Sequence, residues 1–165
     1  AYRRGDLDLA EDFAHAAMPA IHASGDVFVE TMNLGNIAQI ALARGAISQA
    51  AAGFADALRL ADEIDARWSI IDIVAGTAAV SAALGRQAQA VQLLAAADAA
   101  RERSGHPRLP HFGLFAQTSA AVRGTLDDQA WHEHWQEGRR LTLDEALAHA
   151  RTTLSEARMT GHVGT

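Results

Sequence analysis

Three glycines recur at a constant spacing in this sequence, at Gly5, Gly45 and Gly85. Each is followed by alanine at the fifth and at the twelfth position after it. Self-similarity at a fixed period of about 40 residues is typical of repeat proteins, in which every unit is one supersecondary structure that buries its apolar face against its neighbours. The period therefore predicts a row of similar units that have no separate cores.

Alanine accounts for 38 of the 165 residues, whereas aromatic residues make up only 5%. Alanine is the strongest helix former and is depleted in β-strands. Glycine and proline, at 13 and 3 residues, are too few for a collagen-like or low-complexity chain. We therefore expect an all-α fold.

The unit over residues 26–64 has the pattern of a helical hairpin. Asp26 is a suitable N-cap for a helix over 27–43. Gly45 supplies the left-handed residue of a tight turn, and a second helix follows over 46–64.

One face of that second helix carries Ala50, Phe54 and Ala57. Small residues let two helix axes approach closely, and one large side chain can then fill the groove between them. This face therefore predicts the contact between neighbouring hairpins.

The unit over 65–103 repeats the pattern, with Asp65 as the expected N-cap and Gly85 at the turn. Its helices are predicted over 67–83 and 86–103. The unit over 1–25 contributes only its second helix, so we expect the chain to begin within a repeat and to be a piece of a longer protein. The first helix would then expose an apolar edge, which favours a homo-oligomer.

The repeat stops after residue 103, where Pro107 and Pro110 predict a loop. The rest predicts an irregular C-terminal cap over 111–158. Its expected parts are a helix over 111–123, a turn at Gly124, a helix capped by residues 125–128 and running to Glu137, a turn at 138–141, and a helix from the capping box Thr142–Glu145 to about Arg158. Residues 1–165 would then form one domain.

The spacing of Gly45, Ile47, Ala50, Phe54 and Ala57 resembles the tetratricopeptide signature around its mid-hairpin turn. The repeat period of this chain, about 40 residues, is longer than the usual 34 of that family. The resemblance implies an α-α superhelix, that is, a tetratricopeptide-like solenoid of lengthened hairpins.

The C-terminal segment, with Trp131, Trp135, Gly138-Arg139, Leu141 and Glu145-Ala146, resembles the closing segment of large bacterial regulators of the LuxR-type, signal-transduction ATPase architecture. This resemblance implies a segment of a bacterial transcriptional regulator. The P-loop motif and a basic recognition helix are missing from the sequence. ATP and DNA binding would therefore belong to other parts of such a regulator.

Candidate catalytic and metal-binding patterns have simpler explanations. His132 and His134 are two positions apart, so a helix directs them to different sides and they cannot chelate one ion. The pairs Asp127–Asp128 and Asp144–Glu145 fall in first turns of predicted helices, where negative charge is favourable. We therefore expect no catalytic residue, metal or cofactor, and keep a metal-dependent hydrolase as a remote alternative.

Trp68, Trp131 and Trp135 could stack on a ligand, but we expect all three to pack in the core, because Trp131 and Trp135 are one helical turn apart.

The first helix of each hairpin lines the concave surface in tetratricopeptide-like solenoids, so the resemblance implies a binding groove on helix 27–43. Its register places Met32, Asn36 and Gln39 near that groove, together with Asp72 from the next unit. Amide side chains are adaptable hydrogen-bonding groups. The alternative is an ordinary solvated helix face.

The net charge of −6 argues against direct nucleic-acid binding by this segment. The absence of cysteine fits a reducing cytoplasm, and the longest uncharged apolar stretch is too short to cross a membrane. We expect a non-enzymatic, cytoplasmic module for protein interaction or signal sensing, whose partner is another protein or another domain of the regulator. The alternative is a sensor domain that binds a small-molecule effector such as a sugar.

Overall fold

The computed structural model describes residues 7–105 and 114–160, and every regular element in these two ranges is an α-helix. The all-α prediction is therefore confirmed. Gly5, the two loop prolines and the first residues of the helix expected over 111–123 lie outside the described residues. The helices of the described part are α1 (Leu7–Ser24), α2 (Val27–Ala43), α3 (Ile47–Glu63), α4 (Arg67–Ala83), α5 (Gln87–Ser104), α6 (Leu114–Arg123), α7 (Asp128–Arg140) and α8 (Leu143–Thr160).

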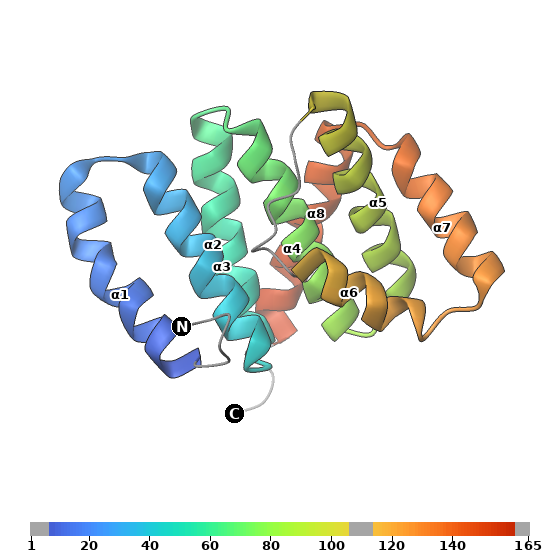
Figure 1. Cartoon of the computed structure of the whole chain (residues 1–165), viewed down its shortest axis with the longest axis horizontal. Coiled ribbons are helices and arrows are strands. Elements are labelled where there is room, and N and C mark those ends of the chain that lie inside the picture. The colour runs from blue at the N-terminus through green and yellow to red at the C-terminus, as the bar shows by residue number, and fades with distance from the viewer. Residues whose placement is uncertain (1–6, 106–113, 161–165) are drawn as a thin grey trace.

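Helices α2 and α3 pack against each other as one hairpin, and α4 and α5 pack as the next (Figure 1). These are the two hairpins expected over 26–64 and 65–103. Helix α1 lies against α2, and α3 contacts α4, so the hairpins stand side by side. The N-cap prediction for α2 is confirmed, because the Asp26 carboxylate accepts a hydrogen bond of 3.1 Å from the Val29 amide.

Residues with a left-handed backbone conformation end the helices at a constant spacing of about 20 residues, so each repeat period contains two of them. They are Gly25, Gly45, Asp65, Gly85 and Gly105, with φ between 49° and 76°. The prediction that Asp65 is an N-cap is therefore wrong: Asp65 occupies the turn position that glycine holds elsewhere, and Ala66 precedes α4 without a side-chain cap. Asp tolerates this conformation better than most residues, but at a cost that glycine does not bear.

Three of these turns share one hydrogen-bond pattern, in which the residue after the left-handed position bonds back five residues. The N···O distances are 2.9 Å for Ala46 to Ala41, 2.8 Å for Ala66 to Ala61 and 2.9 Å for Arg86 to Ser81. This long-range closing bond is the mark of the Schellman motif. It satisfies a carbonyl at each helix end and reverses the chain in the same way each time.

The central contact between the hairpins joins Phe54 of α3 to α4. Phe54, Ala50 and Ala57 are almost fully buried, as their spacing predicted. A Cβ atom on Gly76 would lie only 2.5 Å from the Phe54 ring. The ring therefore occupies the space that the missing side chain of Gly76 leaves on α4.

Gly138 lies inside α7 rather than in the turn expected at 138–141, which is a correction to the sequence prediction. A Cβ atom at Gly138 would lie 2.2 Å from the backbone oxygen of Gln92 on α5. The glycine thus permits α7 and α5 to cross in backbone contact. The helix continues past Glu137 to Arg140.

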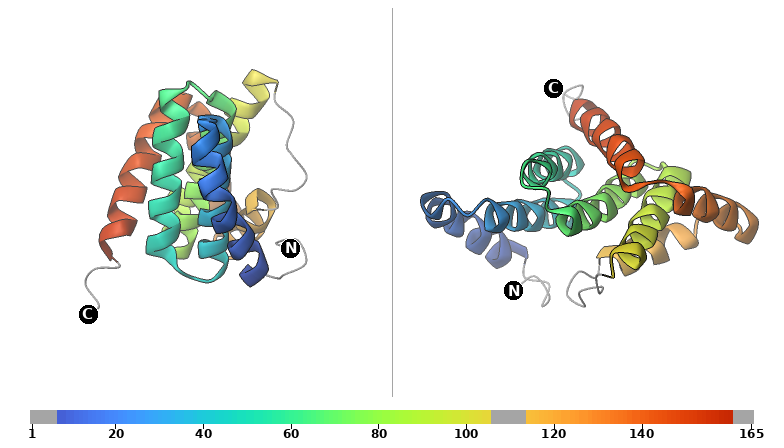
Figure 2. Two further views of the ribbon diagram at one scale, coloured as in Figure 1. Left: turned by 90° about the vertical axis from the view of Figure 1, so that its left-hand side faces the viewer. Right: turned by 90° about the horizontal axis from the view of Figure 1, so that it is seen from above.

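Helix α8 turns back along the hairpins and contacts α3, α4 and α5 (Figure 2). Its start is the predicted capping box, in which the Thr142 amide donates to Glu145 at 2.8 Å and the Glu145 amide donates to the Thr142 hydroxyl at 3.2 Å. The hydrogen bonds that Thr142 donates hold the pKa of Glu145 below its ordinary value. The side chains that α8 buries in the main core are Ala146, Leu147, Ala150, Leu154 and Ala157.

Replacing Gly138 by Ala is expected to lower the free energy of unfolding by about 1–3 kcal/mol, because the new methyl group meets backbone rather than a movable side chain. Gly35→Ala is the matched control, since no atom lies within 4 Å of a Cβ there. That variant should gain up to about 1 kcal/mol from helix propensity. Urea denaturation measures both values, and equal effects in the two variants would contradict the close crossing at Gly138.

Replacing Asp65 by Gly is expected to raise the free energy of unfolding by up to about 1 kcal/mol, because the strain of a left-handed Asp disappears. The exposed carboxylate lies 3.8 Å from Arg67, and the loss of such a pair costs little. Gly85→Ala, at the equivalent turn, should lower stability instead. Thermal unfolding of both variants tests the assignment, which a destabilised Asp65→Gly protein would refute.

Candidate functional site

The four groove residues expected from the sequence line one small hollow between α2 and α4. Met32, Asn36 and Gln39 lie one to two turns apart on the same face of α2, and Asp72 faces them from the first half of α4. The structure therefore brings all four together, and their role in binding stays a prediction.

The hollow is narrow because an aromatic ring and a glycine shape it. Phe54 reaches it from α3, and Gly35 of α2 leaves its wall without a side chain. Its volume of about 30 Å³ matches the space of one water molecule. A sugar is far larger, so the hollow in this form cannot enclose the kind of effector considered above.

Asp72 forms an ion pair of 2.5 Å with Arg101 of α5, which the sequence analysis did not identify. The Arg101 side chain is only 10% exposed, and its Nη1 atom has no hydrogen-bond partner among the described residues. Arg101 follows a stretch of α5 that consists of alanine and leucine apart from Asp98, and a charge at the end of such an apolar stretch was the available signal. The ion pair joins α4, which lines the hollow, to α5, which lies in the core.

Ser69 adds a second polar group to the hollow. Its hydroxyl is buried and has no hydrogen-bond partner within the described ranges. The lining thus offers the hydroxyls of Ser69 and Thr31, two amides, and a carboxylate that is held by an arginine. This set can donate hydrogen bonds to a peptide backbone and accept them from it.

A second, wider hollow continues along the same side of the molecule. It has a volume of about 410 Å³ and lies between α2, α4 and α6, and Gln39 borders both hollows. Gln87 at the start of α5 also lines it and keeps a buried side-chain oxygen without a partner in the described part. Together the two hollows, which share Gln39, form a groove lined mainly by apolar side chains with several amides among them, which we call the α2–α4–α6 groove.

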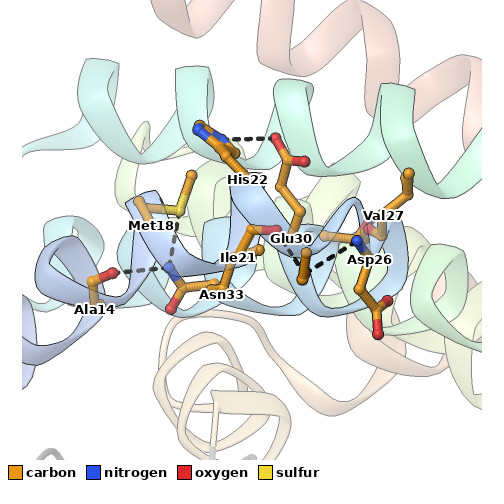
Figure 3. Close-up of polar contacts among 10 residues, drawn as sticks. Ala14, Met18, Ile21, His22, Asp26, Val27, Glu30 and Asn33 are labelled. Carbon is orange, nitrogen blue, oxygen red and sulfur yellow. Dashed lines mark hydrogen bonds and ion pairs between the residues drawn. The ribbon is translucent and has the colours of Figure 1, made fainter.

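Asn33, another amide of α2, points away from this groove toward α1 (Figure 3). Its Nδ2 atom donates to the Ala14 carbonyl at 2.8 Å and approaches the Met18 sulfur at 2.9 Å. These contacts lie beside Pro19, which interrupts the hydrogen bonds of α1. Asn33 therefore fastens α1 to α2. In the same interface His22 lies 3.1 Å from Glu30.

His134 and the carboxylates singled out in the sequence have structural partners. His134 lies 3.0 Å from Glu137, which lowers the pKa of that carboxyl. Asp127 caps α7 by accepting from the Ala130 amide at 2.8 Å. Within residues 7–105 and 114–160, no group of three His, Asp or Glu side chains is placed to hold a metal ion.

The three tryptophans lie at the edge of the core and not inside it, which corrects the prediction. Each is half-buried. Trp131 and Trp135 stack on each other with ring centroids 5.7 Å apart, and Trp68 stacks on Phe28 at 5.9 Å. Phe28 and Trp68 are separated by one full repeat period, so equivalent positions of successive hairpins touch directly.

Comparison with known proteins relates the chain to a segment of transcriptional regulators. Three relatives, two from strains of Mycobacterium tuberculosis and one from Mycobacterium bovis, are each named "Putative HTH-type transcriptional regulator". Each is 28% identical over 148 residues, which cover 89% of this chain. The chain spans only 16% of the length of these curated relatives. No family model and no solved structure matches the chain.

No helix in the described part of the chain combines the length and the hydropathy needed to cross a membrane.

Replacing Asp72 by Asn is expected to lower the free energy of unfolding by about 1.5–3 kcal/mol, because the nearly buried Arg101 keeps its charge and loses its carboxylate. The double variant with Arg101→Met should lose less than the sum of the two single variants. Arg59→Met is the control, since the exposed pair of Arg59 with Glu63 contributes about 0.5 kcal/mol at most. Strictly additive losses in urea denaturation would show that Asp72 and Arg101 are not coupled.

Proposed function

We propose that this chain is a non-enzymatic helical-repeat segment of a transcriptional regulator, and that it contacts a protein partner or another part of the same regulator. The similarity to the mycobacterial regulators over 89% of the chain carries this proposal. Because the chain spans 16% of those proteins, it would supply one module, while ATP or DNA binding would reside elsewhere. A cytoplasmic location follows from such a role.

The α2–α4–α6 groove is the proposed contact surface. Asn36 is exposed, Gln39 is half-buried, and both can exchange hydrogen bonds with a peptide backbone in either direction. The narrow end between α2 and α4 would take a side chain or a backbone turn, and the wider end near α6 would take a larger group. The tetratricopeptide resemblance supports the same face, because the first helix of each hairpin lines it.

The groove also suggests how a signal could pass through the segment. Its walls come from helices of different hairpins, so an occupant that fits one spacing of α2, α4 and α6 would favour that spacing. The equilibrium between two states of such a regulator would then shift by the ratio of the occupant's affinities for those states. The small-molecule alternative needs the wider hollow, since the narrow one holds only about one water molecule.

The test uses variants Asn36→Arg and Gln39→Arg, which add charge and bulk to the groove, and Gln136→Arg on the exposed face of α7 as the matched control. The 165-residue chain is titrated with the other segments of the protein that contains it, and is screened by thermal shift against sugars and other small molecules. We expect binding to a protein segment that both groove variants weaken and the control retains. A ligand from the thermal-shift screen would favour the effector alternative, and binding that all three variants retain would rule out the groove.

A further inference from the structure

The sequence contains no lysine, so all 14 Lys-plus-Arg residues are Arg. Most arginines in the described part hold a carboxylate closely, as Arg139 does with Glu102 at 2.6 Å and Arg151 does with Asp62 at 2.5 Å. Arg103 and Arg140 form no ion pair with a described residue, and Arg67 reaches carboxylates only at 3.8 and 3.9 Å. In a chain with net charge −6, weakly paired arginines stand out.

These three arginines surround one hollow, although they come from three different helices. Arg67 is the first residue of α4, Arg103 is the next to last residue of α5, and Arg140 is the last residue of α7. The contributing ends of α4, α5, α7 and α8 meet along the upper edge of the molecule in Figure 1. The hollow has a volume of about 500 Å³, within the range of ligand sites of about 300–1,000 Å³.

The rest of this hollow is lined by apolar side chains, chiefly Ile71 of α4, Leu141 and Leu143, and by the hydroxyl side chains of Ser104 and Thr142. Ile71 is buried, and the two leucines are half-buried. A guanidinium presents a planar set of donors that matches the two oxygens of a carboxylate or a phosphate. The lining therefore combines guanidinium groups that can bind an oxyanion with apolar side chains that can contact the apolar part of the same ligand.

We propose that this hollow, which we call the arginine hollow, binds a small organic anion whose carboxylate or phosphate group contacts Arg67, Arg103 and Arg140 and whose apolar part rests on Ile71, Leu141 and Leu143. It lies apart from the α2–α4–α6 groove and shares no lining residue with it. The inference therefore does not depend on the proposed function, and each can fail without the other.

Several carboxylates lie near the arginine hollow. Glu102 interacts electrostatically with Arg103, but Glu102 is already paired with Arg139. Glu137 interacts electrostatically with Arg140, but Glu137 is already paired with His134. Asp65 and Asp144 lie near Arg67 at the limit of ion pairing, and both are exposed. Arg103 donates to the Leu141 carbonyl at 3.3 Å, which uses one of its five donors. Glu145 is engaged by Thr142 in the capping box. The contact from Arg103 also fixes that guanidinium at the rim.

The test measures binding of three probes to the full chain by calorimetry: inorganic phosphate, benzoate and phenyl phosphate. We expect phenyl phosphate to bind roughly tenfold more tightly than inorganic phosphate, because its ring covers apolar surface. Arg140→Gln should weaken phenyl phosphate binding roughly tenfold. Arg140 is exposed and interacts electrostatically with Glu137 at the surface, so Arg140→Gln should fold normally.

Arg158→Gln is the matched control. Arg158 is an exposed arginine of α8 with no described carboxylate partner, and it lies roughly four helical turns beyond Leu143, about 22 Å along the axis. Binding that this variant loses as strongly as Arg140→Gln would reveal non-specific charge attraction and overturn the proposal. No binding of any probe, or equal affinity for inorganic and phenyl phosphate, would overturn it too. Binding of an acidic peptide without binding of phenyl phosphate would assign the arginine hollow to a protein segment instead.

Discussion

The structure depends on close helix crossings at positions where a side chain is missing. The Phe54 ring of α3 lies against α4 at Gly76, and α7 meets the backbone of α5 at Gly138. With 38 alanines, the chain has few large side chains to fill space between helices, so the axes must come close before apolar surface is buried. Each glycine provides that approach at one place. The hairpins and the returning α8 then share one continuous core.

The same crossing shapes the candidate site. Phe54 separates the core from the narrow hollow between α2 and α4, so the ring that joins the hairpins also limits what the hollow can hold. The Asp72–Arg101 pair fixes α4 to α5 beside it. On another part of the surface, the ends of four helices gather three arginines around the arginine hollow. The two surfaces differ in charge, so they would recognise different chemical groups.

Features that depend on neighbours in the sequence were predicted well. The Asp26 cap, the Thr142–Glu145 capping box and the bounds of α4 all follow from interactions within a few residues. Asp65 and Gly138 were interpreted by residue type alone, and both interpretations were wrong. Asp is common at N-caps and also tolerates left-handed turns, while glycine ends helices and also permits close crossings. Only the position of the next helix distinguishes these roles.

The sequence by itself determined the helical state, the sites of most turns and the face that carries Ala50, Phe54 and Ala57, because propensity, capping and periodicity act over one or two turns. The tetratricopeptide resemblance added that Met32, Asn36, Gln39 and Asp72 lie near one surface, and all four line the narrow hollow. The tertiary structure alone decided that α8 returns across α3, α4 and α5, that Asp72 meets Arg101, and that three arginines surround one hollow. These contacts join residues far apart in the chain, and their geometry depends on the packing of whole helices, which no local pattern encodes.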